Sequence, residues 1–227
     1  MSMHLQYEID RLERRVLELG ALVEENINKA VRALEKRDVK MAREVIKGDN
    51  EVDEMEVELE EECLKLLALY QPVAVDLRFI IAALKINNDL ERVGDLATNI
   101  AKCVEPYSAY PEIVLPVDIH EMAQIALALL RKSLDAFVKL DTKLAHDVRQ
   151  DDREVDSYNR EAEKLVSEAI KKHPDKEEGY LQLILVARHI ERLGDHATNI
   201  AEDIIYMLEG EIVRHSKNNR TRNSTRE

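Results

Sequence analysis

The sequence of 227 residues contains no tryptophan, and aromatic residues make up only 4% of it. It is also poor in residues that interrupt regular secondary structure, with 6 glycines and 5 prolines, whereas 35% of its residues are charged. Sheet proteins are enriched in aromatic and β-branched residues and need many turns. The composition therefore argues against a β-sheet protein and indicates a helical one.

Cysteine is almost absent as well. Cys63 and Cys103 are the only two in the chain, which is too few for a disulfide scaffold, and both fall on apolar faces rather than in a sulfur-ligated metal motif. No apolar run approaches the roughly 20 residues that cross a bilayer. The first residues turn charged at Glu8 and Asp10, without the apolar core of a signal peptide. We therefore expect a soluble protein of the reducing cytoplasm.

Positive charge is scarce relative to negative charge. The chain has 46 acidic and 33 basic residues, and its formal net charge is −13. Such a balance argues against a nucleic-acid-binding surface and favours cations or basic partner surfaces.

The sequence also lacks the usual signatures of catalysis. It has no glycine-rich phosphate loop, no nucleophile elbow, and no serine or cysteine with a partnered base. No Glu-x-x-His occurs, which argues against a ferritin-like di-iron oxidase. We therefore expect a protein that is not an enzyme.

The sequence does contain one segment that occurs twice. Residues 91–101 (ERVGDLATNIA) return as residues 191–201 (ERLGDHATNIA), displaced by 100 positions, with nine identities among eleven. A second pair of phrases, residues 49–53 (DNEVD) and 152–156 (DREVD), is displaced by 103 positions. Because the displacement changes between the two pairs, a loop separates the phrases and places them on different elements. The chain is therefore two copies of one unit.

Apolar residues recur at helical spacing in both copies. In the first copy the steps of four and three residues run through Phe79, Ala83, Ile86, Leu90, Val93, Ala97, Ile100 and Val104. The same positions of the second copy are Gly179, Leu183, Val186, Ile190, Leu193, Ala197, Ile200 and Ile204. With Asp38 and Asp141 as N-caps and Pro72 and Pro174 in turns, the pattern predicts helices near residues 4–36, 38–70, 75–105, 117–140, 142–172 and 176–209.

The predicted fold is all-α, with two tandem antiparallel three-helix bundles related by the internal repeat. Three prolines in residues 106–116 forbid a continuous helix there and predict a stiff connector. The last residues are almost free of apolar side chains, which predicts a disordered tail. The expected organisation is a first repeat over 1–105, a connector over 106–116, a second repeat over 117–209 and a tail over 210–227.

Each repeat carries two pairs of carboxylates spaced four residues apart. In the first repeat these are Asp49 with Asp53 and Glu91 with Asp95, and in the second Asp152 with Asp156 and Glu191 with Asp195. Any one such pair is most often a solvated helix face. These pairs, however, flank the apolar positions of neighbouring antiparallel helices, so the two pairs of one repeat should border the same groove.

Four carboxylates in one groove repel each other unless a cation or a proton lies between them. Because the arrangement occurs twice, it predicts a cation site in each half, lying on the bundle surface. Oxygen ligands of this kind suit Mg, Mn, Ca or iron. Gly94 and Gly194, which lie between the acids of the second pair, leave room either for an ion or for close helix packing. Asn99, Asn199 and His196 are candidate additional ligands, although His196 is more simply an ordinary boundary histidine.

The two E/D-x-x-x-D motifs of each half, together with residues 70–78 (YQPVAVDLR) and 91–101, resemble the PhoU family over roughly residues 5–208. The resemblance implies a cytoplasmic accessory regulator that restrains the high-affinity phosphate transporter and its sensor-kinase signalling when phosphate is plentiful. It implies multinuclear metal clusters, with iron as the first choice and manganese or magnesium as alternatives, held by the eight carboxylates named above. Asn88 of the first half is replaced by Arg188, so the two clusters need not be alike.

The same resemblance implies partners, namely the ATPase subunit of the phosphate ABC transporter and the phosphate sensor histidine kinase. It also implies a homodimer, no contact with nucleic acid, and only peripheral contact with membrane complexes. Two other readings stay open from the residues alone. One is a metalloenzyme acting on phosphate compounds, because adjacent cations can activate water. The other is a purely structural helical adaptor with solvated acids.

Overall fold

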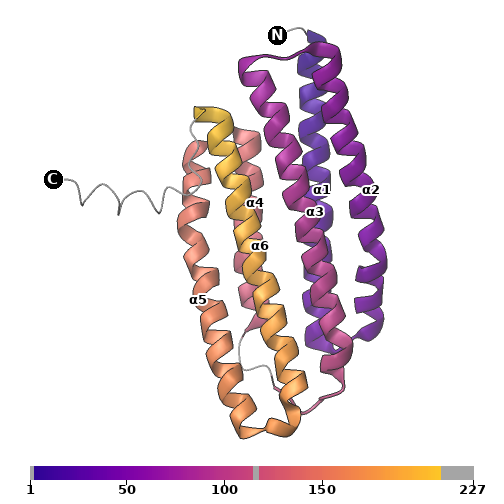
Figure 1. Ribbon diagram of the computed structural model, residues 1–227, viewed down its shortest axis with the longest axis vertical. Coiled ribbons are helices and arrows are strands. Elements are labelled where there is room, and N and C mark those ends of the chain that lie inside the picture. Colours follow the sequence, from indigo (N-terminus) through magenta and orange to yellow (C-terminus); the bar gives the residue numbers. More distant parts are fainter. Residues whose placement is uncertain (1–2, 115–117, 211–227) are drawn as a thin grey trace, which may run out of the picture.

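The computed structural model describes residues 3–114 and 118–210. These ranges contain no strand. Figure 1 shows long α-helices lying side by side in two groups, α1–α3 and α4–α6. The helices are α1 (Met3–Lys36), α2 (Val39–Tyr70), α3 (Ala74–Ser108), α4 (Ile119–Lys139), α5 (Thr142–Lys172) and α6 (Glu177–Glu209).

These bounds confirm the predicted helices to within three residues at each end. The apolar positions predicted to form the helix interfaces are all buried, from Phe79 to Val104 in α3 and from Gly179 to Ile204 in α6. A helix packed on one side keeps its apolar residues at steps of three and four, which is the spacing that the sequence shows. The predicted helical period is therefore the one that builds the core.

Aspartate caps fix the starts of α2 and α5. The carboxylate of Asp38 accepts a hydrogen bond from the backbone N–H of Met41 at the start of α2. At the start of α5, Asp141 accepts from the N–H groups of Lys143 and Leu144. Each cap satisfies N–H groups that have no partner inside the helix, which confirms both predicted N-caps.

The turn of each half contains the predicted proline. Pro72 lies in the short link between α2 and α3, and Pro174 begins a 3₁₀ turn, Pro174–Lys176, before α6. A proline cannot donate the backbone hydrogen bond that would continue the preceding helix. One difference from expectation concerns Pro106, which lies inside the last turn of α3 rather than after it, so that the helix continues to Ser108.

The two halves, α1–α3 and α4–α6, lie against each other rather than apart (Figure 1). Helices α3 and α6 are antiparallel neighbours along the seam between the halves, and α1 also packs against α4. The buried side chains of all six helices form one continuous hydrophobic core. The repeat therefore builds two bundles that share a core.

Polar contacts order the α3–α6 seam. The Arg78 guanidinium donates to the carbonyl oxygen of Met207 at 2.8 Å, and Nζ of Lys85 lies 3.1 Å from Oδ1 of the buried Asp203. Further along α3, Asp89 contacts His196. Residue numbers rise on α3 while they fall on α6, as expected for antiparallel helices.

The segment after α3 is held by Arg37, at the end of α1. Its guanidinium donates to the hydroxyl of Tyr107 and to the carbonyl oxygen of Ile113, and it lies over the Tyr107 ring. Tyr110 in turn donates to Glu178 at the start of α6. The connector is thus bound to both halves. Residues 115–117 of the predicted connector lie outside the described residues, as does the predicted tail from residue 211.

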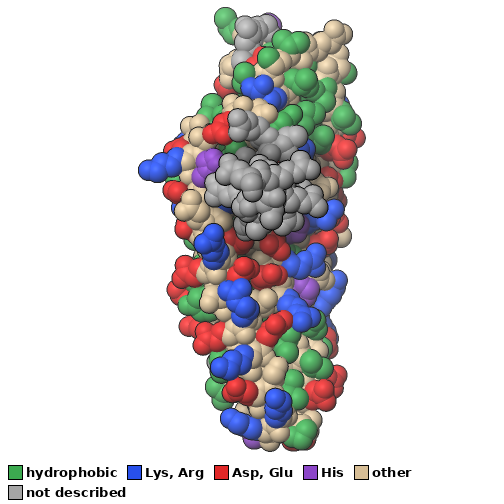
Figure 2. Space-filling model, turned by 60° about the vertical axis from the view of Figure 1, so that its left-hand side comes forward, with side chains coloured by type: hydrophobic (Ala, Val, Ile, Leu, Met, Phe, Trp, Pro, Cys, Tyr) green, Lys and Arg blue, Asp and Glu red, His purple; other side chains and the backbone are tan. Residues whose placement is uncertain are grey.

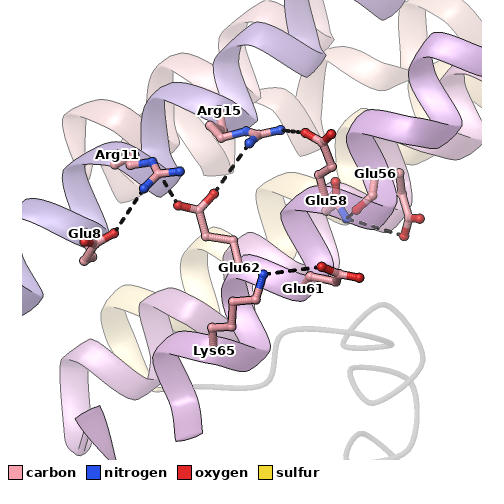
Figure 3. A network of polar contacts seen from close by, with 9 residues as sticks. Glu8, Arg11, Arg15, Glu56, Glu58, Glu61, Glu62 and Lys65 are labelled. Carbon is pink, nitrogen blue, oxygen red and sulfur yellow. Dashed lines mark hydrogen bonds and ion pairs between the residues drawn. The ribbon is translucent and has the colours of Figure 1, made fainter. Parts of the chain in front are cut away.

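Ion pairs join α1 to α2 on the outside of the first half. Figure 3 shows Arg11 between Glu8 and Glu62, and Arg15 between Glu58 and Glu62. Pairs that remain accessible to solvent, such as Arg15 with Glu58, contribute little to stability. Their geometry nevertheless favours a single register of α1 against α2.

None of the described helices is long and apolar enough to cross a bilayer. Exposed apolar side chains do gather at the end of the first half that projects beyond the second half in Figure 1. They belong to the start of α1 and to the α2–α3 turn, and include Met3, Tyr7, Leu69, Val73 and Val75. Hydrophobic side chains are also prominent toward the upper end of the face in Figure 2, whereas charged side chains of both signs cover its lower part.

Candidate metal centre

The four predicted carboxylates of the first half lie over the groove between α2 and α3. Asp49 and Asp53 project from α2, and Glu91 and Asp95 project from α3. The residues are exposed or half-buried, in contrast to the buried apolar positions beside them. The acids therefore flank the helix interface on the bundle surface, as the spacing predicts.

The electrostatics show that these four side chains lie close enough to repel. Burial raises the pKa of Glu91, and the carboxylates of Asp95 and Asp53 raise it further. Burial likewise raises the pKa of Asp49, and it too is affected by Asp53 and Asp95. Because Asp53 is on α2 and Glu91 on α3, the coupling crosses the groove.

The second half repeats this arrangement between α5 and α6. Burial raises the pKa of Glu191, and the carboxylates of Asp195, Asp156 and Asp152, in that order, raise it further. The two halves differ one turn away, where Arg188 of α6 pairs with Glu163 of α5 at 3.0 Å. In the first half the corresponding residue, Asn88, accepts a hydrogen bond from Arg92 of its own helix.

Gly94 and Gly194 allow the paired helices to approach closely at both grooves. A Cβ atom on Gly94 would lie 2.9 Å from Cγ1 of Val52 and 3.6 Å from Oδ1 of Asp49. On Gly194 it would lie 2.7 Å from Oδ1 of Asp152. The glycines thus permit close packing, and in both halves the space they leave is bordered by the first carboxylate of the neighbouring helix.

The side chains fit a metal centre in chemistry and location, but they are not arranged as a finished one. Within the described residues, no three Asp, Glu, His or Cys side chains converge as the ligands of a single ion would. Repulsion favours separation of like charges. Each groove could present its hard oxygen donors to a cation only after the carboxylates rotate toward it.

Two of the candidate additional ligands, His196 and Asn199, contact Asp89 of the other half. Nδ1 of His196 lies 2.8 Å from Oδ1 of Asp89 in the first half, and Nδ2 of Asn199 lies 3.4 Å from the same oxygen. Both side chains are therefore engaged across the α3–α6 seam. Asn99 is half-buried, and its backbone carbonyl oxygen accepts a hydrogen bond from the thiol of Cys103.

Three neighbours of the first groove are not among the predicted site residues. The nearby Thr98 hydroxyl and the charge of Lys102 both lower the pKa of Asp49 against the effect of burial. On α2, Glu56 is close enough to raise the pKa of Glu91. All three lie three or four residues from a predicted ligand on the same helix, or one turn further, so helical spacing is the signal that could have found them.

The cysteines do not take part in either groove. Both are buried and free, and burial raises the pKa of Cys63 to about 12 and that of Cys103 to about 11. Their thiols are therefore protonated near neutral pH, and a thiol in that state is neither a good nucleophile nor a good metal ligand.

The PhoU domain model matches the chain twice, over residues 16–104 and 119–204, which correspond to the two bundles. Among curated proteins, the phosphate-specific transport system accessory protein PhoU homolog of Aquifex aeolicus is 40% identical over 213 residues, which cover 94% of this chain and 96% of that protein.

Two solved structures have the same fold. The crystal structure of PhoU from Pseudomonas aeruginosa superposes with a TM-score of 0.85 at 34% identity and covers 91% of this chain and 99% of that one. The phosphate transport system regulatory protein PhoU from Streptococcus pneumoniae gives 0.82 at 33% identity, with 92% and 99% covered. With its two domain matches, its repeated acidic grooves and this shared fold, the chain belongs to the PhoU family.

Proposed function

We propose that this chain is a cytoplasmic accessory regulator of the high-affinity phosphate transport system. In this role it restrains the ABC transporter and the signalling of its sensor histidine kinase when phosphate is plentiful. The observation that carries the proposal is the similarity, over nearly the whole chain, to a protein named as an accessory protein of that system. The related proteins are named as accessory or regulatory proteins rather than enzymes, which supports a role without catalysis.

Metal binding is the second part of the proposal. The eight groove carboxylates would hold multinuclear clusters, with iron as the first choice and manganese or magnesium as alternatives. Two observations support this assignment: the donors are all hard oxygens, and burial together with repulsion from the neighbouring carboxylates raises the pKa of Glu91 and Glu191. A bound cation would offset that repulsion and make each groove less negative, which changes the charge that a partner meets.

The two clusters need not be equal. Arg188 brings a positive charge to the edge of the second groove, where the first half has the neutral Asn88. The first groove also has Glu56 nearby. The first groove is therefore the more negative of the two, and we expect it to bind the larger total charge of metal ions.

Binding partners form the third part. We infer that the chain contacts the transporter's ATPase subunit and the sensor kinase from the cytoplasmic side, peripherally to the membrane, and that it acts as a homodimer. The exposed apolar residues at the free end of the first half, among them Leu69 and Val73, support an interaction surface there. Contiguous exposed apolar patches on soluble proteins often mark such surfaces. Sedimentation of the purified chain tests the dimer.

The regulatory role is tested in cells that lack the gene. Phosphate uptake and a reporter of the sensor kinase should both rise at high phosphate in these cells and return to normal when the gene is restored. The ATPase subunit, used as bait, should retain the protein from cell extracts. If uptake and reporter are the same with and without the gene, and the bait retains nothing at high or low phosphate, the regulatory role is wrong.

A further inference from the structure

The α1–α4 side of the seam between the halves is hollowed. A groove of about 540 Å³ lies between α1 and α4. Polar contacts cross it: Gln124 donates to Asn28 at 2.9 Å, and Arg131 of α4 pairs with Glu24 of α1. A molecule in this groove would touch both halves at once.

The groove is a positive site in an acidic chain. Lys29, Arg32 and Arg131 line it, with His120 at its edge, against the carboxylates of Glu24 and Glu25. The formal charge of these lining residues is positive even with His120 neutral, whereas the chain as a whole carries −13. Local positive charge of this kind attracts anions.

Most of these charges are already paired. Lys29 lies 2.7 Å from Glu25, and Arg131 pairs with Glu24. His120 lies 3.5 Å from Glu35. Arg32 differs, because it is exposed and makes no hydrogen bond or ion pair with any residue in the described part of the chain. Its planar guanidinium is therefore available to an oxyanion in the two-bond geometry that arginine favours.

The carboxylates of the groove select among oxyanions. Near neutral pH an inorganic phosphate ion keeps at least one proton and can donate it in a hydrogen bond, whereas sulfate has only acceptors. Glu24 is the less exposed of the two acids, and its side chain is held by Arg131. A carboxylate held in place beside cations can accept a hydrogen bond from protonated phosphate. The same carboxylate repels sulfate, which has no proton to donate.

The lining also argues against a nucleotide. Apart from Ala21, every described lining side chain is polar or charged, and the one ring among them is the imidazole of His120, which faces Glu35 at 3.5 Å. Nucleotide bases are usually held by stacking on aromatic side chains or by apolar walls. The groove offers no apolar wall, and its one aromatic ring is already engaged by a carboxylate.

We propose that this groove binds inorganic phosphate, with Arg32 as its principal anchor and Glu24 as the acceptor for its proton. Both of these groups lie on α1, and Arg131 of α4 lines the same groove. Phosphate bound there would lie between the two halves and thereby bias how they are placed. That this bias reports phosphate supply rests on the regulatory function proposed above. Binding itself does not depend on that function, so the two proposals can fail separately.

Calorimetric titration of the whole chain with inorganic phosphate tests the proposal. The protein is first stripped of metal with a chelator, so that cations in the acidic grooves cannot bind phosphate, and ionic strength is held constant. We expect saturable binding of one phosphate per chain. Arg32→Gln should weaken it about tenfold, the usual effect of losing a hydrogen bond between charged groups. Arg14→Gln is the matched control, because Arg14 is an exposed arginine of the same helix whose one hydrogen bond within the described residues goes to the backbone carbonyl oxygen of Asp10.

Sulfate and a nucleotide complete the test. Wild-type protein should prefer phosphate to sulfate, and Glu24→Gln should reduce that preference while leaving a folded chain, since glutamine can still accept a bond from Arg131. The assignment is overturned by any of four results: no saturable phosphate binding, equal weakening by Arg32→Gln and Arg14→Gln, equal affinity for sulfate, or tighter binding of AMP than of phosphate.

Discussion

Nδ1 of His196 lies 2.8 Å from Oδ1 of Asp89, and the contact joins the second half of the chain to the first. Both side chains are largely buried, at 10% and 14% exposure. The repeat does not duplicate this pair, because Leu96 and His189 occupy the corresponding positions. The junction between the halves is therefore built from residues in which the two copies differ, whereas the grooves are built from residues that they share.

The seam should be sensitive to loss of one partner of its buried ion pair. Asp203 is 2% exposed and pairs with Lys85 across the seam. Lys85→Met removes that cation from a buried carboxylate, so it should lower the free energy of unfolding by about 2 kcal/mol in urea denaturation. Lys139→Met breaks the exposed pair with Asp135 and should change it by less than about 0.5 kcal/mol. Equal losses would contradict the structural importance of the seam pair.

Metal binding should be separable between the halves. Glu91→Ala with Asp95→Ala should remove the metal of the first half only, because the two grooves share no residue. The equivalent change at Glu191 and Asp195 should remove the metal of the second half. Elemental analysis of both purified double variants measures the loss.

A matched control comes from the outward face of α2. Glu51 and Glu54 are exposed and make no hydrogen bond or ion pair with described residues, so replacing both with alanine should leave metal content unchanged. Two independent sites are ruled out if a groove variant keeps the full load, or if one groove variant, still folded, loses the metal of both halves.

The metal-free protein should lose stability as pH rises through the acidic range. In the folded chain the pKa of Glu91 and of Glu191 lies above its ordinary value of 4.5. Between the ordinary and the raised pKa the folded state therefore holds more protons than the unfolded state, so its relative stability falls as pH increases. Urea denaturation of chelator-treated protein at a series of pH values measures this slope.

Glu91→Gln combined with Glu191→Gln should flatten the slope, because neither side chain can then ionise. Added metal should take the place of the lost protons and restore stability at the higher pH values. A slope that is the same in wild type and in the double variant would show that these carboxylates are not strained in the folded chain.

The helix glycines should respond differently to alanine. At Gly94 the new Cβ would meet Cγ1 of Val52 at 2.9 Å, inside the core, so Gly94→Ala should destabilise by about 1 kcal/mol despite the better helix propensity of alanine. At Gly48, also within a helix, a Cβ would meet nothing within 4 Å. Gly48→Ala should therefore stabilise by about 0.5–1 kcal/mol.

Gly194→Ala distinguishes packing from metal binding. Its Cβ would lie 2.7 Å from Oδ1 of Asp152, the end of a side chain that can turn away. Stability should fall less than in Gly94→Ala, while the metal content of the second half should drop. Unchanged metal content would remove Asp152 from the set of ligands.

The fold was largely predictable, because the spacing of apolar residues along an amphipathic helix shows which of its faces packs against other helices. The aspartate caps at Asp38 and Asp141 and the buried apolar positions of α3 and α6 followed from local pattern. The close contact of α3 with α6 did not, since it depends on pairs such as Lys85 with Asp203 that are more than a hundred residues apart. Pro106 was misleading as a helix end, because a proline in the last turn removes only one backbone donor.

The acidic grooves were predictable in position but not in detail. Helical spacing brought Asp53 and Glu91 together across a groove. It did not reveal that His196 would turn to Asp89 of the other half, because the partner of a boundary side chain is set by tertiary packing. Thr98, which lies three residues after Asp95 and close enough to affect the pKa of Asp49, could have been found from helical spacing. That the grooves bind metal, and which metal they bind, stays a prediction.

The order of helices along the chain bears on how the protein folds during synthesis. Helices α1–α3 are consecutive and pack on each other, so the first bundle can assemble as soon as Ser108 has left the ribosome. The face of α3 that later contacts α6 then stays exposed to solvent until α6 has been synthesised. Lys85 and Asp89 place charges on that exposed face. These charges lower its tendency to associate with other nascent chains before α6 packs on it.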